Sequence, residues 1–311
     1  MVATNDYDGP AQIKGFTDST PRGTGYPSMT VLAASWNQNL AYKFGQSFGD
    51  DMKSVGVNGL WGWAIDTHRT AFFSRNHESP SEDSILAGYT VMNAVQGLNT
   101  RGRYCFLKHF AVYDCGQNSD VRGQRQTSYW LTEQSLREVQ LRAFYKPFVI
   151  GGALGAMTTY RGIGAEASET TEALIGGVLR GEWQFKGAIT TDYTSFKTAS
   201  ETLLRIGGNL AMGNGLITEY YSTEDLRFQN RLKDSMHEVI YMWLRADYNE
   251  REYKAKIESG EIQEDILSAT TINSWQWWRP AIKGINVFAT VVLSTWGVFT
   301  LINLIDPRRR F

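Results

Sequence analysis

Short apolar runs alternate with longer amphipathic stretches along most of this chain. Runs rich in small, β-branched and aromatic residues predict strands over 59–66, 103–112, 152–160, 187–193 and 207–213. Between them, apolar positions at helical spacing predict helices over 81–98, 132–150 and 168–183. Strands that alternate with helices of this length are typical of βαβ units, so the pattern predicts an α/β domain with a parallel sheet.

Two local signals refine the helices. Ser79 and Glu82 have the spacing of a capping box, which predicts the start of the helix over 81–98. Residues 226–245 carry one apolar stripe at helical spacing, which predicts a last helix packed on the sheet. The charged stretch that follows, 246–280, reads as a linker, so we expect the folded domain to cover 1–245.

The C-terminal end has a different pattern. Residues 284–305 contain no charged side chain, and this length matches a helix that crosses a bilayer. A tryptophan-rich segment at 275–278 precedes the run and three arginines at 308–310 follow it, as at membrane interfaces. We expect a single transmembrane helix over 281–306 in the cell membrane, with the domain on the extracellular side and the basic tail 307–311 in the cytoplasm. A buried core helix is the alternative reading.

Polar residues gather where the predicted strands end: Asp66 to Arg69, Lys108-His109, Tyr160-Arg161 and Thr191-Asp192. A (β/α) barrel carries its active site on the face formed by the carboxyl ends of its strands. A doubly wound sheet would instead place ligands at one crevice, and no GxGxxG motif opens a helix here. The spread of polar residues over nearly every strand therefore favours a TIM-like barrel.

Composition adds few constraints on function. The net charge of −1 gives no general reason to expect nucleic acid as a partner, and no Lys/Arg run suggests a groove that follows phosphates. Cys105 and Cys115 do not form a CxxC pair, so we predict no zinc site, and no metal or cofactor is expected. The two thiols read as inert, with a disulfide between them as the alternative. The many aromatic residues suit core packing first and a sugar-binding cleft second.

Five separated motifs resemble those of family 3 glycoside hydrolases, the β-glucosidase-like enzymes, and they occur in the family's order. They are "DGPAQI", "HRTAFFSRNHESPSED", "KHFAVYD", "MTTYRGIG" and "LRGEWQFKGAITTDY". The resemblance covers roughly residues 7 to 245. It implies a TIM-like barrel and a retaining, exo-acting β-glycosidase whose substrate is a terminal β-linked sugar.

The resemblance also implies roles for single residues. Asp192, in "TDY", matches the nucleophile, although an acid after a strand is by itself more often a helix cap. The residues that match the family's binding site for the same sugar ring are Asp8, Arg69, Lys108, His109 and Tyr160. Nearby cations such as Lys108 would keep the nucleophilic carboxylate ionised. Arg75 and Glu78 read as an ion pair that supports a loop outside the site.

The general acid is unassigned. Retaining hydrolysis needs a second carboxyl group about 5–5.5 Å from the nucleophile, and most of the family takes it from a separate sandwich domain. Only seven residues precede "DGP", so we expect a barrel that is incomplete at its N-terminus, in a fragment of a domain-reversed enzyme. The acid would then come from a domain absent from this chain or from a second chain, with Glu166, Glu169 and Glu172 as internal alternatives. The competing function is an inert sugar-binding fragment or structural remnant.

Overall fold

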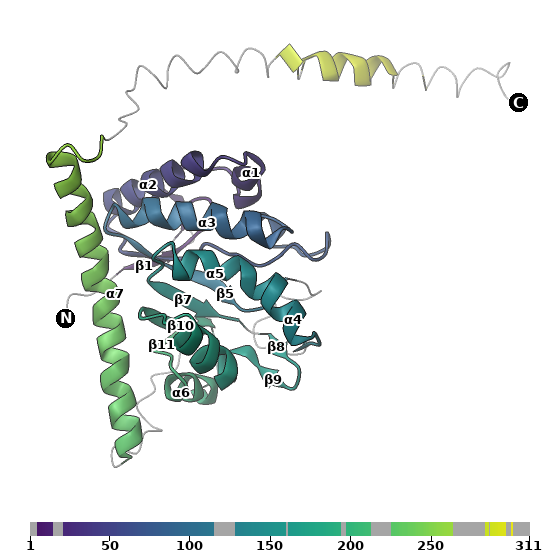
Figure 1. The fold of residues 1–311 in the computed structure, drawn as a ribbon. Helices are drawn as coiled ribbons and strands as arrows, with labels where there is room; N and C mark the ends of the chain where they lie inside the picture. Colours follow the sequence, from purple (N-terminus) through teal and green to yellow (C-terminus); the bar gives the residue numbers. More distant parts are fainter. Residues whose placement is uncertain are drawn as a thin grey trace, which may run out of the picture. The chain divides into compact units, whose positions relative to one another are not determined.

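A sheet of eight strands, most of them parallel, forms the centre of the larger of two units (Figure 1). The contacts within the chain divide it into residues 1–255 and 256–311. The computed structural model describes residues 5–14, 21–114, 128–159, 161–193, 197–212, 225–263, 284–285, 287–296 and 300.

Six strands of this sheet pair in parallel: β1 (Asp6–Asp8), β4 (Gly59–Trp61), β5 (Tyr104–Phe110), β7 (Gly155–Thr158), β10 (Ala188–Tyr193) and β11 (Leu210–Met212). They lie side by side in the order in which they occur along the chain. This order is that of a (β/α) barrel, because a doubly wound sheet reverses its strand order at a switch point. The predicted strands correspond to β4, β5, β7, β10 and β11, and their predicted parallel pairing is confirmed.

The sheet is a half-barrel. Two antiparallel strands, β2 (Ile13–Lys14) and β3 (Pro21–Arg22), extend it beyond β1. Over the described residues it ends at β3 on one side and at β11 on the other. The expected TIM-like α/β fold is therefore confirmed, but as an open sheet, because the parallel run has fewer than the roughly eight tilted strands that closure requires.

Helices follow the strands as in βαβ units. The long ones are α2 (Gln38–Ser54), α3 (Ser84–Asn99), α5 (Leu141–Val149) and α7 (Leu226–Glu258). Shorter ones are α1 (Met29–Ala34), α4 (Glu133–Ser135), α6 (Lys197–Arg205), two 3-10 turns, η1 (Asn76–Glu78) and η3 (Ser168–Thr170), and two π-helical segments, η2 (Leu136–Gln140) and η4 (Ala173–Glu182). The predicted helices correspond to α3, the run from α4 to α5, η4 and α7. The pattern missed α1 and α2.

A small second sheet lies at the carboxyl ends of the parallel strands. It consists of β6 (Ser128–Tyr129), β8 (Gly162–Ile163) and β9 (Glu166–Ala167), in the order β6-β8-β9. The β8–β9 hairpin follows β7 directly in the chain, so it belongs to the face on which the polar residues gather.

The start of α3 differs from the prediction. Asp83, not Ser79, caps the helix, and its Oδ1 accepts hydrogen bonds from the backbone N–H groups of Ile85 and Leu86. The carbonyl oxygen of Ser79 lies in the preceding loop and accepts a hydrogen bond from the Thr30 hydroxyl. Aspartate is as good a cap as serine, so the capping-box prediction was wrong by one turn.

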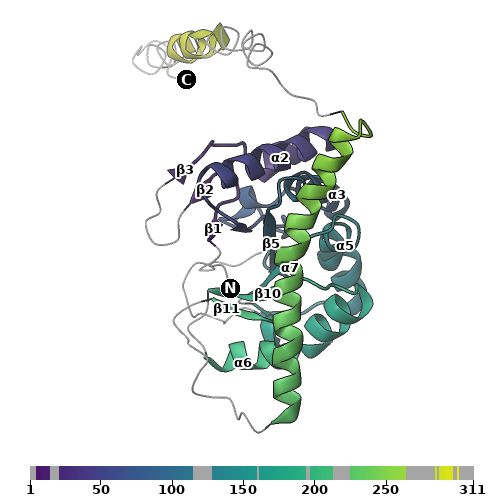
Figure 2. The same ribbon diagram turned by 90° about the vertical axis from the view of Figure 1, so that its left-hand side faces the viewer.

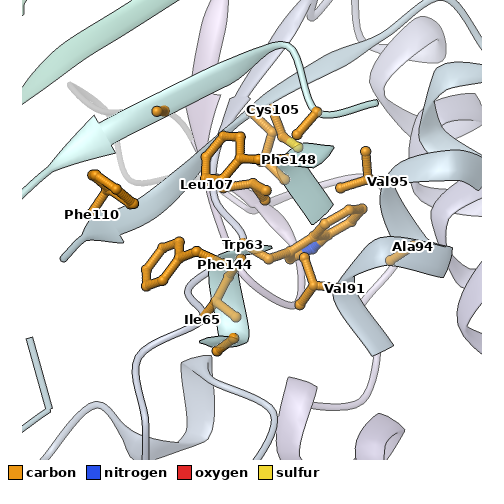
Figure 3. Packing of buried hydrophobic residues seen from close by; sticks show 14 of the residues in the cluster. Trp63, Ile65, Val91, Ala94, Val95, Cys105, Leu107, Phe110, Phe144 and Phe148 are labelled. Atoms are coloured by element: carbon orange, nitrogen blue, oxygen red, sulfur yellow. The ribbon is translucent and has the colours of Figure 1, made fainter. Parts of the chain in front are cut away.

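The main core lies between the sheet and the helices on its outer face. Figure 3 shows Trp63 and Ile65, beyond β4, packed against Val91 of α3, Leu107 of β5 and Phe144 of α5. Gly45 of α2 and Gly97 of α3 let these two helices pack closely. A methyl group at either position would collide with the backbone of the opposite helix. These contacts cover the outward residues of the strands.

A second, smaller core lies on the opposite, inner face of the sheet. Tyr104 and Phe106, which alternate with outward residues of β5, pack with Met242 and Ala246 of α7. Figure 2 shows α7 running in front of β5 and β10. The predicted packing of the last helix is confirmed. Its predicted end at residue 245 is not confirmed. The helix continues into the first part of the predicted linker, as far as Glu258, and buries Tyr253.

The predicted membrane span is not confirmed. Residues 284–285 and 287–296 are helical. Within the described part of the chain, no helix combines the length and apolarity needed to cross a membrane. Residues 297–299 and 301–305 of the predicted span lie outside the described residues, as do Cys115 and the tail.

Candidate active site

The carboxyl ends of the parallel strands bring charged side chains together on the inner face. Asp8 ends β1, Asp66 follows β4, Lys108 and His109 lie on β5, and Asp192 lies on β10. An isolated parallel bridge between Ala64 and Lys108 extends the β4–β5 pairing toward Asp66. Because these strands are neighbours, residues far apart in the sequence lie at one edge.

Two ion pairs form one half of this cluster. Lys108 Nζ lies 2.9 Å from Asp8 Oδ1 and 4.0 Å from Glu78 Oε2. Arg75 donates from Nε and Nη2 to Glu78 Oε1 and Oε2, at 2.6 and 2.9 Å. Burial opposes ionisation of both acids, but their cationic partners outweigh it and lower the pKa of Asp8 and of Glu78. Both carboxyl groups are therefore anionic at neutral pH.

His109 forms the other half. Its Nδ1 lies 2.8 Å from Asp66 Oδ2, and both residues are buried. Its backbone N–H also donates to Asp66, at 3.3 Å. Burial, with the positive charges of Arg75 and Lys108, holds the pKa of His109 well below its usual value, and burial raises the pKa of Asp66. The imidazole is thus neutral and fixed in orientation.

Asp192 lies against this histidine. Its Oδ2 is 3.7 Å from His109 Nε2, and its Oδ1 accepts the backbone N–H of Tyr193 at 2.7 Å. The residue is 8% exposed. A carboxylate at a strand end, close to the charge of Arg75 and beside a neutral imidazole, can attack an electrophilic carbon when it is ionised.

Arg75, and not Arg69, lies within the charged cluster, and the sugar-binding role of Arg69 stays a prediction. The charge of Arg75 acts on Asp8, Asp66 and His109. Arg69 is half-exposed, with its Nε 3.4 Å from Asp114 Oδ1 and its guanidinium over the Tyr129 ring. The loop after β4 turns between these two arginines, so only the second reaches the inner face.

Other site residues also escaped sequence analysis. Glu78, read as a loop support, lies beside Lys108, and Asp66, noted only among the polar residues at strand ends, pairs with His109. The ring of Tyr113 lies tilted against that of His109, with the ring centres 4.4 Å apart, and Arg161 is buried beside it. The available signal was the i, i+3 Arg–Glu spacing inside "SRNHE". Tyr160 lies outside the described residues.

The internal candidates for a general acid differ in burial. Glu166 and Glu172 are exposed, whereas Glu169 is 1% exposed. None of the described contacts joins these residues to Asp192, so none is assigned as the acid.

A pocket of about 240 Å³ opens beside the cluster. It is lined by Thr67, which follows Asp66, and by Arg69, Trp130 and Gln140. The Trp130 ring is 81% exposed, and Gln140 hydrogen-bonds Thr67 at its base. An open aromatic face beside polar groups is suited to a sugar ring.

Comparison with known proteins identifies the family. Residues 10–207 match the glycosyl hydrolase family 3 N terminal domain. The chain belongs to this family. It is 26% identical over 224 residues to Beta-glucosidase A of Butyrivibrio fibrisolvens, covering 72% of this chain and 26% of that protein. It is 30% identical over 199 residues to Beta-glucosidase BoGH3A of Bacteroides ovatus, covering 63% and 26%. The chain thus spans about a quarter of the length of these relatives.

Solved structures of this family share the fold. The glucose complex of β-glucosidase 3B from Thermotoga neapolitana superposes with a TM-score of 0.67 at 22% identity, covering 84% of this chain and 38% of that one. A β-glucosidase from Bifidobacterium adolescentis superposes with a TM-score of 0.69 at 24% identity, covering 79% and 36%. The TIM-like architecture therefore extends to this chain.

Proposed function

We propose that this chain carries the nucleophilic half of a retaining β-glycosidase that releases terminal β-linked sugars of the glucose type. The carrying observation is the position of Asp192, 3.7 Å from the neutral His109 and on the same edge as the Lys108–Asp8 pair. The names of the relatives, which are β-glucosidases, support the same reaction class.

The nucleophilic and sugar-binding roles of the reaction have groups in this chain. An Asp192 oxygen attacks the anomeric carbon while the bond to the leaving oxygen breaks, and the product is a glycosyl ester. Water then attacks the same carbon, gives one proton to the carboxylate that acted as the acid in the first step, and releases the sugar and the Asp192 carboxylate. Asp8, Lys108 and Arg75 hold the sugar hydroxyls through charge-assisted hydrogen bonds, which strengthen as the ring becomes oxocarbenium-like.

The leaving oxygen must also receive a proton. We assign this task to a carboxyl group in a domain outside this chain, consistent with the quarter of the relatives' length that it spans. Without such help, the rate of the first step depends steeply on the leaving group, so a dinitrophenyl glycoside reacts and an alkyl glycoside does not.

A 2-deoxy-2-fluoro glycosyl fluoride tests the nucleophile, because its leaving group needs no acid. We expect intact-mass spectrometry to show one added sugar, located on Asp192 by peptide mapping. Asp192→Asn abolishes the label, whereas Asp234→Asn, at an exposed acid of α7, retains it. An unlabelled protein with native circular dichroism would contradict the proposal.

The competing function is an inert sugar-binding remnant. The observation in its favour is that no general acid is assigned among the described residues. It predicts that glucose binds, by calorimetry, to a protein that no activated fluoride labels.

The proposal includes a membrane tether over 281–306, with the domain outside the cell and the tail in the cytoplasm. Its support is the uncharged run 284–305 between tryptophans and arginines. We expect the full chain to stay in the membrane fraction after alkaline extraction and a chain ending at residue 280 to be released. Release of both would refute the tether.

A further inference from the structure

Arg161 is a buried cation that the proposed mechanism does not use. It follows β7, which lies between β5 and β10, the strands that carry His109 and Asp192. Its guanidinium carbon lies 5.3 Å from the centre of the Tyr113 ring, which contacts the His109 ring at a tilted angle. Only 2% of the residue is exposed. Arg161 therefore belongs to the same cluster as the nucleophile.

The other two cations of the cluster, Lys108 and Arg75, each pair with an acid. Lys108 pairs with Asp8, and Arg75 binds both oxygens of Glu78. Arg161 differs, because its Nε and Nη2 are buried without a hydrogen-bond partner and it forms no ion pair with the described acids. The Tyr113 ring offsets part of this cost through a cation–π contact, but it supplies no negative charge.

A bound ligand can supply the negative charge that none of the described acids gives to Arg161. A sugar hydroxyl accepts a hydrogen bond from a guanidinium but leaves its charge uncompensated. A carboxylate accepts two parallel hydrogen bonds and cancels the charge, and its planar geometry matches the guanidinium fork. A buried guanidinium that pairs with none of the described acids, one strand away from the nucleophile, thus favours an anionic sugar over a neutral one.

We propose that Arg161 recognises the carboxylate of a uronic acid, so that the substrate of this site is a β-linked glycosiduronate. This proposal rests on the proposed function for the hydrolysis reaction. Recognition of the uronate carboxylate is a matter of binding and can be measured without that reaction. It specifies the sugar more narrowly than the glucose type and makes Arg161 a specificity residue.

Calorimetric titration of the wild-type chain with D-glucuronate, D-glucose and glucose 6-sulfate tests recognition directly. We expect glucuronate to bind about tenfold or more tightly than glucose. Equal binding of the two sugars, or tighter binding of glucose, would overturn the proposal. Preference for the sulfate over glucuronate would overturn the assignment of the anion to a uronate.

Substitutions locate the preference. Arg161→Met should remove the preference for glucuronate while leaving glucose binding within about threefold, and Arg161→Lys should keep part of it. Arg161→Gln serves if the Met variant does not fold. The matched control is Arg142→Met, at an exposed arginine of α5, which should change neither affinity. A preference that survives in Arg161→Met and Arg161→Gln would contradict the assignment.

Labelling with 2-fluoro glucosyl and glucuronyl fluorides separates this proposal from the reaction itself. Preferred binding of glucuronate without any labelling would refute the role of Asp192 and leave the Arg161 assignment standing. Equal slowing of both labels in Arg161→Met, with no binding preference in the wild type, would show that Arg161 acts on Asp192 and not on the sugar.

Discussion

The two faces of the parallel sheet are built from alternate residues of the same strands, yet they differ in what they bury. On β5, Cys105 and Leu107 enter the large outer core under the helices. Tyr104 and Phe106 enter the small inner core under α7, and Lys108 enters the charged cluster beyond it. The difference shows that one strand can serve stability on one face and chemistry on the other.

The inner face also changes along the strand. At the amino ends α7 covers apolar side chains, and at the carboxyl ends ion pairs and the His109–Asp66 pair take over. Substitutions on the outer face should therefore reduce stability, and substitutions at the carboxyl end of the inner face should reduce activity.

The largest difference between an effect on activity and an effect on stability is expected at Asp192. Asp192→Asn should lower the rate of labelling or turnover by about 10³-fold or more, because the amide is not a nucleophile. Its melting temperature should stay close to that of the wild type. Kinetics with an activated aryl glycoside and a thermal melt provide the two measurements. If Asp192→Asn instead unfolded the protein and left the rate per folded molecule unchanged, Asp192 would serve stability and not activity, which would contradict the prediction.

On the outer face, Trp63→Ala should cost about 3–5 kcal/mol of unfolding free energy. Trp63 is fully buried and touches the rings of Phe44 and Phe48. Urea titration measures the loss, and Trp63→Phe, which refills most of the cavity, should recover more than half of it. Labelling of Asp192 per folded molecule should not change.

The inner core under α7 should contribute less to the free energy of unfolding than the outer core. Met242→Ala should cost about 2–4 kcal/mol, since Met242 is 1% exposed within a smaller cluster. Met236→Ala, at a half-exposed position of the same helix, should stay within about 0.5 kcal/mol. Equal losses in the two variants would show that α7 does not pack on the sheet through Met242.

The smallest predicted effect is a pH dependence from His109. Its pKa is lowered in the folded state, so its contribution to stability is complete above about pH 6.5 and is lost as the pH falls toward the folded value. Between pH 6.5 and 5 the unfolding free energy should fall by up to about 1.4 kcal/mol per pH unit. His109→Gln should flatten this slope, and His237→Gln, at an exposed histidine, should leave it unchanged.

The sequence by itself determined the repeating units and the place of Asp192. Alternation of short apolar runs with amphipathic stretches reports local periodicity, and local periodicity is set by backbone geometry. A strand with an acid next to its last residue, as in 187–193, keeps that acid at the sheet edge in any parallel arrangement. The helix over 226–245 was visible for the same reason.

Only the tertiary structure decided which charged residues meet. Arg69 and Arg75 lie in one motif, and the turn of the loop after β4 sends one to Asp114 and the other to Glu78. It also decided that the sheet is open over the described residues and that α7 covers its inner face. Such choices depend on contacts between residues far apart in the chain, which a local pattern does not encode.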